Sequence, residues 1–505
     1  QEGRNSHLSI LRRRHRAGRF DPSAVTPPPP PLQDRSSAMR GAGGVSPSFM
    51  VLDSIVDLDE LVAPPRPEWE SIYCSSKKAY GCGKHGQELV EGLGLYAHHR
   101  CSGLPSSLCI RLSDQAFRSI RAELGYTQGR VPAKGVISNA SQQLLVLLLT
   151  FHSYDELSKR RYCLVFDSTD ASLCMVPYIL YPFEAHCTAT VIPLRGAAAK
   201  DHELVLMVND AREQKAGWCR LCVCSPATRA KSESGDGTAP WKVTGDLRFP
   251  LLCPYLSADV MFSSQGKVFW ADLSQGVAYS DLRARDGAVK FNFIKLPKAY
   301  RIHWDWSTDE PRELPLMSRT MGCVGGSIKF ICIDRSHRRR GSELVRVWTL
   351  DLDNGWWKES KGILWKELWK KVRFMPAEHR DVVPQYPTLM PDAGALCLLC
   401  KVKRPRSGAE TDFICSFDMC SKSLLSSQRV VDYDTIGRVP MPYNFFTLCN
   451  PPPPPKGKLP SHASEQPAHD KKLPTQKRKL PTIWKETSKR SAVALQVVPP
   501  PHHVS

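Results

Sequence analysis

A short stretch with the sequence HWDWSTDE, at residues 303–310, carries the side chains best suited to chemistry on a ligand. Trp304 and Trp306 could stack on a sugar ring, and Asp305 and Asp309 could act as the pair of carboxylates that glycosidases use. Such a pair needs a defined separation, and burial must raise the pKa of one of its members. The stretch therefore predicts a ligand loop, and a solvated acidic loop is its simpler interpretation.

Two groups of cysteines have the two-residue spacing that zinc sites use. One contains Cys219, Cys222 and Cys224, and the other contains Cys397 and Cys400. Zinc requires sulfurs that converge on one ion. Both groups lie in apolar, strand-like patterns, where residues three apart point to opposite faces. We therefore expect buried free thiols at these positions, and we assign no metal and no cofactor.

A glycine-rich stretch, GCGKHG at residues 81–86, matches the G-x-G-x-x-G pattern of dinucleotide-binding loops. That fingerprint requires a buried strand before it, a helix after it and an acidic residue about 20 positions further on. Residues 71–80 are polar, and Leu-Pro-Ser stands near position 105. We therefore expect a flexible loop here and no nucleotide.

Two clusters of basic residues could contact nucleic acid. They are Arg338, Arg339 and Arg340, and Lys477, Arg478 and Lys479. Clustered Lys and Arg bind phosphates by releasing counterions. The first cluster is expected at the tip of a hairpin and the second in a Pro-rich tail, and in both places basic residues are more often simply solvated. Nucleic-acid binding through the tails therefore remains an alternative function.

The elements that must position these residues are short antiparallel strands. Residues 268–272 and 277–280 are rich in β-branched and aromatic side chains, and apolar and polar residues alternate over 289–293. This alternation is typical of half-buried strands. Between the first two strands, a Ser-Gln-Gly turn is expected to use a positive φ at Gly276.

The same arrangement recurs about every 60 residues. The first strands of the units are anchored at Val146, Leu206, Val268, Ile328 and Leu396, and their partners are expected at 161–167, 218–225, 277–280, 344–350 and 412–418. Such units cannot bury both faces alone, but radial stacking buries them and leaves only short edges. We predict an all-β, propeller-like array of five units, with a sixth completed by N-terminal strands and residues 430–448. Packed β-sandwiches are the alternative.

The first part of the chain gives weaker signals. Residues 49–52 have the pattern of a strand, but 46–103 is otherwise expected to be irregular because prolines and glycines interrupt it. Beyond it, residues 108–112 predict a strand. Ser113 can then cap a short helix that Gly125 ends.

The two ends of the chain differ in composition from the rest. Residues 1–45 and 451–505 are rich in Pro, Lys and Arg and hold most of the net charge of +19, so we expect both to be disordered. A folded domain is expected over 46–450. The chain begins with Gln, and Met39 precedes the first strand, so 1–45 could be a gene-model extension or, alternatively, an organelle transit peptide.

The cysteines and the hydropathy bear on location. The 18 cysteines occur without a secretory signal, which indicates a reducing compartment. The longest apolar run is far short of the roughly 20 residues that a membrane helix needs. We therefore expect a cytoplasmic or nuclear protein, organellar if the N-terminal segment is genuine, without a membrane partner.

Several sequence features, taken in order, resemble a known family. They are Trp270 to Leu273, Leu296-Pro297, Gly326 to Phe330, Val347 to Leu350, Trp356-Trp357, Glu367 to Trp369, Tyr386-Pro387 and Phe417-Asp418. This order is similar to the plant domain of unknown function 1618 (DUF1618), a family expanded in grasses, over roughly 46–450. The aromatic run at 277–279 and the irregular region at 64–103 depart from that pattern. The family brings no catalytic residues, so the resemblance implies none here.

Three functions follow from these observations. The leading hypothesis is a non-enzymatic, propeller-like protein-interaction module, because strands repeat, polar loops vary and no catalytic constellation is evident. The second is a carbohydrate-binding or hydrolytic propeller that uses the loop at 303–310. The third is a nuclear, nucleic-acid-associated protein that acts through its basic tails.

Overall fold

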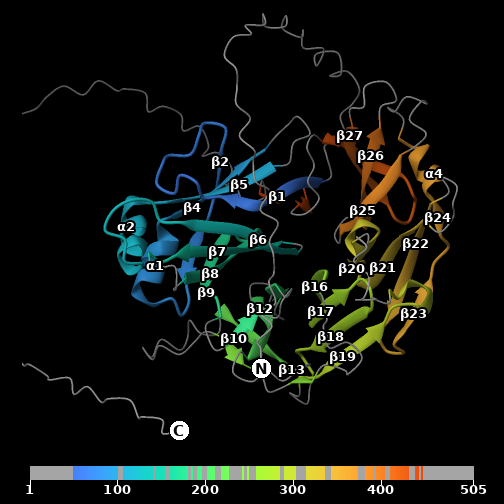
Figure 1. The fold of residues 1–505 in the computed structure, drawn as a ribbon, viewed down its shortest axis with the longest axis horizontal. Helices are drawn as coiled ribbons and strands as arrows, with labels where there is room; N and C mark the ends of the chain where they lie inside the picture. The colour runs from blue at the N-terminus through green and yellow to red at the C-terminus, as the bar shows by residue number, and fades with distance from the viewer. Residues whose placement is uncertain are drawn as a thin grey trace, which may run out of the picture. The chain divides into compact units, whose positions relative to one another are not determined.

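The computed structural model describes residues 49–99, 106–141, 143–154, 159–179, 183–185, 190–195, 202–210, 218–226, 241–243, 247–248, 258–284, 289–302, 314–335, 343–372, 382–390, 394–403, 410–430, 438–442 and 445–446. Most of them lie in strands that form five successive sheets (Figure 1). The expected disordered ends, 1–45 and 451–505, lie outside the described residues, so the predicted domain boundaries stay a prediction.

The first sheet has the strand order β2-β4-β5-β1-β6-β7-β8-β9-β3, and β29 pairs with β1. Its strands are β1 (Phe49–Asp57), β2 (Glu70–Ile72), β3 (Ser76–Ala79), β4 (Leu93–His98), β5 (Ser106–Leu112), β6 (Ala133–Ser141), β7 (Leu144–His152), β8 (Lys159–Asp167), β9 (Ser172–Pro177) and β29 (Arg438–Pro442). Strand β7 is almost continuously apolar because both of its faces are covered. Leu145 and Leu147 face the N-terminal core, whereas Leu144 and Val146 face the core shared with the second sheet.

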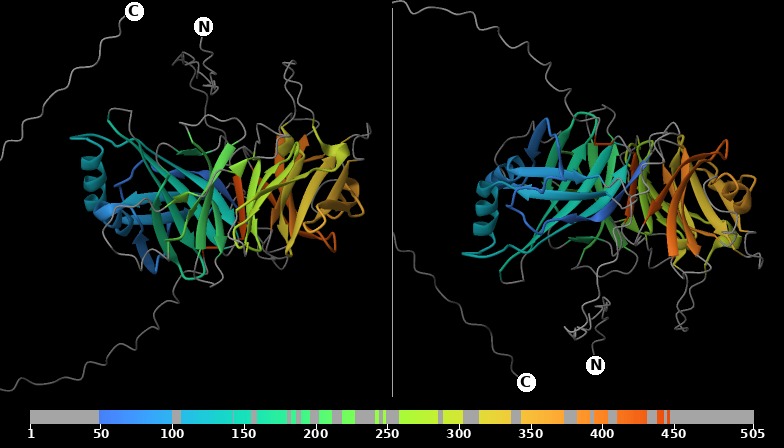
Figure 2. Two further views of the ribbon diagram at one scale, coloured as in Figure 1. Left: turned by 90° about the horizontal axis from the view of Figure 1, so that it is seen from below. Right: turned by 90° about the horizontal axis from the view of Figure 1, so that it is seen from above.

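Two helices lie on the outer side of the first sheet (Figures 1 and 2). In α2 (Asp114–Glu123), the Ser113 side chain accepts a hydrogen bond from the Ala116 N–H at 3.3 Å, as predicted for its cap. Gly125 follows α2 with φ +78°, which confirms the predicted stop. The second helix, α1 (Gly83–Glu91), was not predicted.

The expectations for 46–103 and for residues 81–86 were therefore wrong. The region contains β1 to β4 and α1, and the glycine-rich stretch enters a helix instead of forming a flexible loop. Leu89 and Val90 of α1 are buried against the first sheet. The Nζ atom of Lys77 on β3 donates to the backbone oxygens of Glu91 and Leu93 and so satisfies carbonyls at the end of α1.

Four further sheets follow along the chain. The second contains β10 (Phe183–Ala185), β11 (Ile192–Arg195), β12 (His202–Asp210), β13 (Trp218–Cys224), β14 (Lys242–Val243) and β15 (Leu247–Arg248); the third contains β16 (Val260–Ser264), β17 (Lys267–Asp272), β18 (Gly276–Asp281) and β19 (Phe291–Lys295). The fourth contains β20 (Arg319–Val324), β21 (Ser327–Asp334), β22 (Leu344–Asp351), β23 (Trp356–Glu359) and β24 (Ile363–Leu364); the fifth contains β25 (Val383–Met390), β26 (Ala395–Lys403), β27 (Glu410–Asp418) and β28 (Leu424–Val430). Helix α4 (Trp365–Trp369) and the 3-10 turns η2 (Lys298–Tyr300) and η3 (Pro315–Met317) complete the described elements.

The sheets follow one another around a common centre, with β6, β11, β16, β20 and β25 innermost (Figure 1). Hydrophobic cores lie between successive sheets. One joins the first, second and third sheets, one the third and fourth, one the fourth and fifth, and a small one joins the fifth to Val51 on β1. This arrangement confirms the predicted all-β, propeller-like fold over packed sandwiches. The five predicted anchors lie in β7, β12, β17, β21 and β26, the second innermost strands of their sheets.

The last described strand closes the array onto the first. β29 runs antiparallel to β1 with Phe49 opposite Pro442 and Asp53 opposite Arg438. Just beyond it, Phe445 and Phe446 are buried in the N-terminal core. Residues 438–442 of the 430–448 segment do pair with an N-terminal strand, but they do so within the first sheet. The described residues therefore form five sheets, and the predicted sixth unit is not a separate one.

Glycines shape the tight turns, but not always as expected. Gly276 does not adopt a positive φ, so that prediction was wrong. It is glycine because an added Cβ would lie 2.4 Å from the carbonyl oxygen of Ile294 on the neighbouring strand β19. Positive φ angles occur instead at Gln265-Gly266 and at Gly325-Gly326, the tips of the β16–β17 and β20–β21 hairpins. Two successive positive φ angles are typical of a type I′ turn.

Candidate functional site

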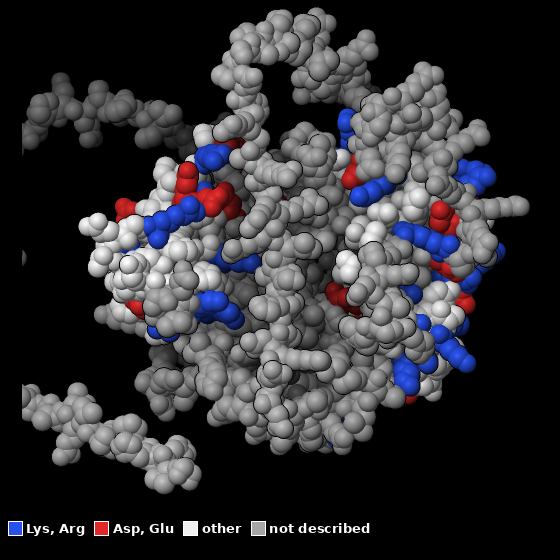
Figure 3. Space-filling model, viewed as in Figure 1, with Lys and Arg blue, Asp and Glu red and all other residues white. Residues whose placement is uncertain are grey.

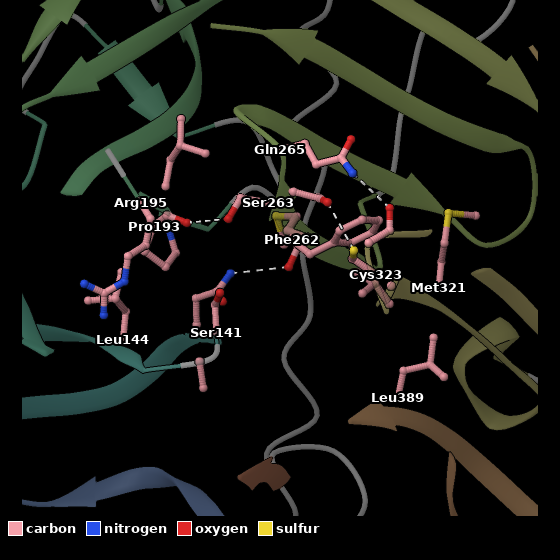
Figure 4. Close-up of a pocket in the computed structure, with 18 of the residues that line it drawn as sticks. Ser141, Leu144, Pro193, Arg195, Phe262, Ser263, Gln265, Met321, Cys323 and Leu389 are labelled. Carbon is pink, nitrogen blue, oxygen red and sulfur yellow. Dashed lines mark hydrogen bonds between the residues drawn. The ribbon is translucent and has the colours of Figure 1, made fainter. Parts of the chain in front are cut away.

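A cavity of about 520 Å³ lies at the centre of the array, among the inner strands. Its lining residues come from β6, β7, β11, β16, β20, β25 and β29, together with the two type I′ hairpin tips. Figure 4 shows part of this lining. A volume of a few hundred Å³ is typical of small-ligand sites and also receives a few side chains of a peptide. The cavity is therefore the candidate site.

Side-chain hydrogen bonds join the inner strands that form the wall (Figure 4). The Ser263 hydroxyl donates to the carbonyl oxygen of Pro193 at 2.7 Å, which connects β16 to β11. The Gln265 side-chain amide donates to the Gly326 carbonyl at 3.2 Å, and the Ser264 hydroxyl and Cys323 thiol lie 3.1 Å apart, which connects β16 to β20. Among the described residues, β11, β16 and β20 each pair with a strand of their own sheet along one edge. These side-chain bonds connect their other edges.

An ion pair stands behind one part of the rim. Arg195, at the end of β11, donates from Nη1 and Nη2 to the two carboxylate oxygens of Asp167, at 2.8 Å each, and the Asp167 side chain is 3% exposed. Burial raises the pKa of Asp167, but hydrogen bonds from Arg195 and from Thr169 outweigh it and hold the pKa below its usual range. A two-pronged pair of this kind fixes the orientation of the guanidinium.

A second arginine crosses the turn of the β16–β17 hairpin. Arg283 follows β18 and is exposed, and its Nη2 atom donates to the carbonyl oxygen of Arg195. Its Cδ atom lies 2.7 Å from the position that a Cβ on Gly266 would occupy. A glycine at position 266 therefore allows the positive φ and also leaves room for the Arg283 side chain.

The rest of the wall is neutral. Its apolar members include Leu144, Met261, Phe262, Met321 and Leu389, and its polar members are hydroxyls, amides and the Cys323 thiol. Among the described residues that line the cavity, the charged side chains are Arg195 and Arg283, and none is Asp, Glu or His. This wall can hold a ligand by hydrogen bonds and apolar contact, but its described residues do not supply the carboxylate pair that glycoside hydrolysis uses.

None of the site residues predicted from the sequence can be placed in this cavity. Trp304, Asp305, Trp306 and Asp309 lie outside the described residues, as do Arg338, Arg339, Arg340, Lys477, Arg478 and Lys479. On the face shown in Figure 3, basic and acidic side chains are interspersed over the described surface. That mixture does not favour a broad cationic groove on this part of the molecule.

The cysteines singled out by spacing lie where the strand pattern placed them. Cys219, Cys222 and Cys224 are buried in β13, and Cys397 and Cys400 are buried in β26. Burial raises the pKa of Cys219 and of Cys222 to about 12, so these thiols remain protonated at neutral pH. The prediction of buried free thiols is confirmed for both groups.

Sequence reasoning missed the cavity residues. Arg195 and Arg283 stand alone in the sequence, and only the fold brings them to one rim. One signal was available, because Gln-Gly and Gly-Gly between strand patterns mark hairpin tips, and both of these tips lie at the cavity.

A half-buried carboxylate, Asp259, lies just before β16. Burial raises the pKa of Asp259 to about 6, and the nearby Asp272 charge adds to the rise, although the Leu273 N–H donates to Asp259 at 2.9 Å and opposes it. Asp272 instead accepts hydrogen bonds from the Ser274 hydroxyl and from the backbone N–H groups of Ser274 and Gln275. The two carboxylates therefore organise the β17–β18 turn.

We expect Asp259→Asn to stabilise the protein at neutral pH. A folded-state pKa above the unfolded value means that the wild-type stability falls as pH rises from about 4 to about 6, by up to about 3 kcal/mol. The asparagine oxygen can still accept from Leu273, so the variant should be about 1–3 kcal/mol more stable at pH 7 and should lack this part of the pH dependence. Urea unfolding of both proteins from pH 4 to pH 8 measures the difference. Parallel stability curves would contradict the expectation.

One comparison with known proteins concerns the part of the array that runs from β17 to β26. Trp270 of β17, Trp348 of β22, and Tyr386 at a bulge in β25 all belong to a continuous part of the ring. Residues 270–397 match the DUF1618 family. Its description is a protein of unknown function. The DUF1618 segment, residues 270–397, carries Arg283, Cys323 and Leu389 of the cavity, whereas Arg195 and Met261 precede it.

Other comparisons concern architecture. No curated protein matches the chain. Among solved structures, the β-propeller domain of the trilobed protease from Pyrococcus furiosus has a TM-score of 0.30 at 8% identity, over 59% of this chain and 71% of that one. The exo-β-1,3-galactanase from Phanerochaete chrysosporium has a TM-score of 0.24 at 11% identity, over 57% and 66%. A GH62 α-L-arabinofuranosidase from Coprinopsis cinerea has 0.23 at 12%, over 57% and 86%. Likenesses this distant say nothing about activity.

Proposed function

We propose that this chain is a non-enzymatic, propeller-like protein-interaction module, and that its central cavity and the surrounding hairpin tips receive a segment of a partner protein. The observation that carries the proposal is the chemistry of the cavity wall. Its described residues offer hydroxyls, amides, two arginines and a broad apolar surface, without a carboxylate or an imidazole. General acid and base catalysis depends on such groups, whereas recognition does not.

The rigidity of the wall supports the same proposal. Hydrogen bonds tie β16 to β11 and to β20, and the Asp167 carboxylate fixes Arg195. A site that is already organised loses less conformational entropy when a partner binds. The type I′ tips, with Gly325 and Gly326 exposed, place backbone groups at the rim where an extended segment could bond to them.

An affinity capture experiment tests the proposal. Tagged residues 39–505 and the same protein with Ser141→Trp are used to recover partners from plant cells. Ser141 lines the cavity and is half-buried, so tryptophan there should fill the space. We expect the variant to lose the partners. Ser107→Trp, on β5 and also half-buried, is the control and should keep them. Equal recovery by all three proteins would contradict the proposal.

The proposal also covers the origin of the protein and its location in the cell. A plant origin within the grass-expanded part of the DUF1618 family is proposed from the sequence resemblance, and a cytoplasmic or nuclear location from the free cysteines. None of the helices in the described part of the chain is long and apolar enough to cross a membrane.

The alternatives are separable from the leading proposal. A carbohydrate-binding or hydrolytic propeller depends on Trp304, Asp305, Trp306 and Asp309, and Asp305→Asn with Asp309→Asn should then abolish sugar binding or hydrolysis. A nucleic-acid-associated role depends on the basic tails, so a protein of residues 46–450 should lose binding to nucleic acid. Neither alternative predicts partner capture that depends on the cavity.

A further inference from the structure

Arg283 brings a positive charge to the rim of the cavity, and the carboxylates nearby do not fully balance it. Arg195 and the buried Asp167 form a pair. Lys267 donates to Asp281 at 2.8 Å, and the Asp281 carboxylate also accepts from the backbone N–H of Arg283. Asp281 thus stands against two cations, Lys267 and Arg283, and among the described residues no further carboxylate forms an ion pair with the Arg283 side chain. Lys267 and Arg283 therefore share one carboxylate.

The structure holds Arg283 in place without neutralising it. Its aliphatic stem lies across Gly266, where any larger residue would collide with it, and Nη2 donates to the carbonyl oxygen of Arg195. A carbonyl oxygen orients a guanidinium but does not offset its charge, and a guanidinium has five N–H donors. An arginine held in this way is prepared to bind an anion.

The cavity that Arg283 lines is partly apolar. Met261, Phe262, Met321 and Leu389 line the same cavity, with Leu144 near its rim (Figure 4). Methionine adapts its shape to varied apolar partners. The complementary ligand therefore has an anionic group next to apolar atoms. A single arginine matches a carboxylate, whereas a phosphate with nearly two negative charges at pH 7 is better matched by several cations.

We propose that the cavity recognises a carboxylate flanked by apolar side chains on an extended peptide, with Arg283 as the residue that binds the carboxylate. This inference rests on the proposed function and names the chemistry of the partner segment. The carboxylate belongs either to an Asp or Glu side chain or to the C-terminus of the partner. Arg283 binds it, and the apolar neighbours occupy the wall formed by Met261, Met321 and Leu389.

Two random octapeptide libraries test the inference, one with a free C-terminus and one with that end joined to the display protein. Selection on residues 39–505 should enrich an acidic residue beside Leu, Ile, Met or Phe in both libraries if a side chain supplies the carboxylate. Enrichment of apolar residues in the free-ended library alone would assign the carboxylate to the terminus. Either result supports the inference, and apolar peptides without any carboxylate requirement would overturn it.

Fluorescence anisotropy with a selected, synthesised peptide then isolates Arg283. A hydrogen bond to a charged group contributes enough that Arg283→Gln should weaken binding about 10- to 100-fold. Arg118→Gln, on the exposed face of α2, is the control and should leave affinity unchanged. If Ser141→Trp abolishes binding but Arg283→Gln does not weaken it, the assignment of Arg283 is wrong while the proposed function stands. Binding that survives Ser141→Trp would count against the cavity itself.

Discussion

Phe445→Ala should destabilise the protein by about 3–5 kcal/mol, which is the usual cost of removing a buried aromatic ring. Phe445 is 2% exposed and packs with its ring centroid 6.2 Å from Phe166 and 5.1 Å from Phe446. It follows the closing strand β29, so its ring fixes the end of the array onto the first sheet. Urea unfolding followed by tryptophan fluorescence measures the loss.

An exposed aromatic residue is the control for the loss of stability expected from Phe445→Ala. Tyr73 is 45% exposed, and Tyr73→Ala should change the free energy of unfolding by no more than about 0.5 kcal/mol. If Phe445→Ala behaves like Tyr73→Ala, the contact between the last described residues and the N-terminal core does not hold the array closed.

Asp167→Ala should cost about 3–5 kcal/mol, because it leaves the guanidinium of Arg195 without its carboxylate partner in a largely buried position. Asp167 accepts two hydrogen bonds from Arg195 at 2.8 Å and others from the Thr169 hydroxyl and N–H. The same substitution should release Arg195 at the rim of the cavity.

The pH dependence of Asp167 provides a second measurement. Its folded-state pKa is lowered, so its stabilising contribution is complete above the unfolded pKa of about 4 and is lost as pH falls through the folded value. The stability of wild type should therefore approach that of Asp167→Ala in acid. Asp170→Ala, in the same turn but exposed, is the control and should cost less than about 1 kcal/mol at pH 7. A constant difference between Asp167→Ala and wild type at all pH values would contradict this account.

Much of the fold could be predicted because the strand pattern is local. The β17–β18 hairpin shows β-branched and aromatic residues on both sides of a short turn, and the apolar strand pairs β21–β22 and β26–β27 follow it along the chain. Helix α1 could not be predicted in this way. Its buried residues Leu89 and Val90 belong to a core that also contains residues of β5 to β9, and Lys77 of β3 satisfies carbonyls at its end in addition to the Gly92 cap.

The candidate site was less predictable for a similar reason. The acidic and basic clusters are visible in the sequence because like side chains lie side by side, but the cavity is lined by residues from seven strands. Arg283 has no neighbour that marks it, and its orientation depends on Gly266 and on the backbone of Arg195. Such a constellation exists only once the strands have assembled.

The pairing of β29 with β1 also constrains when the protein can mature during synthesis. The ribosome synthesises β29 almost 400 residues after β1. The part of β1 that pairs with β29 therefore stays unpaired while every intervening sheet is synthesised. Contacts over such a sequence separation form slowly. Nascent chains that lack β29 are therefore the species in which we expect chaperones to be most needed.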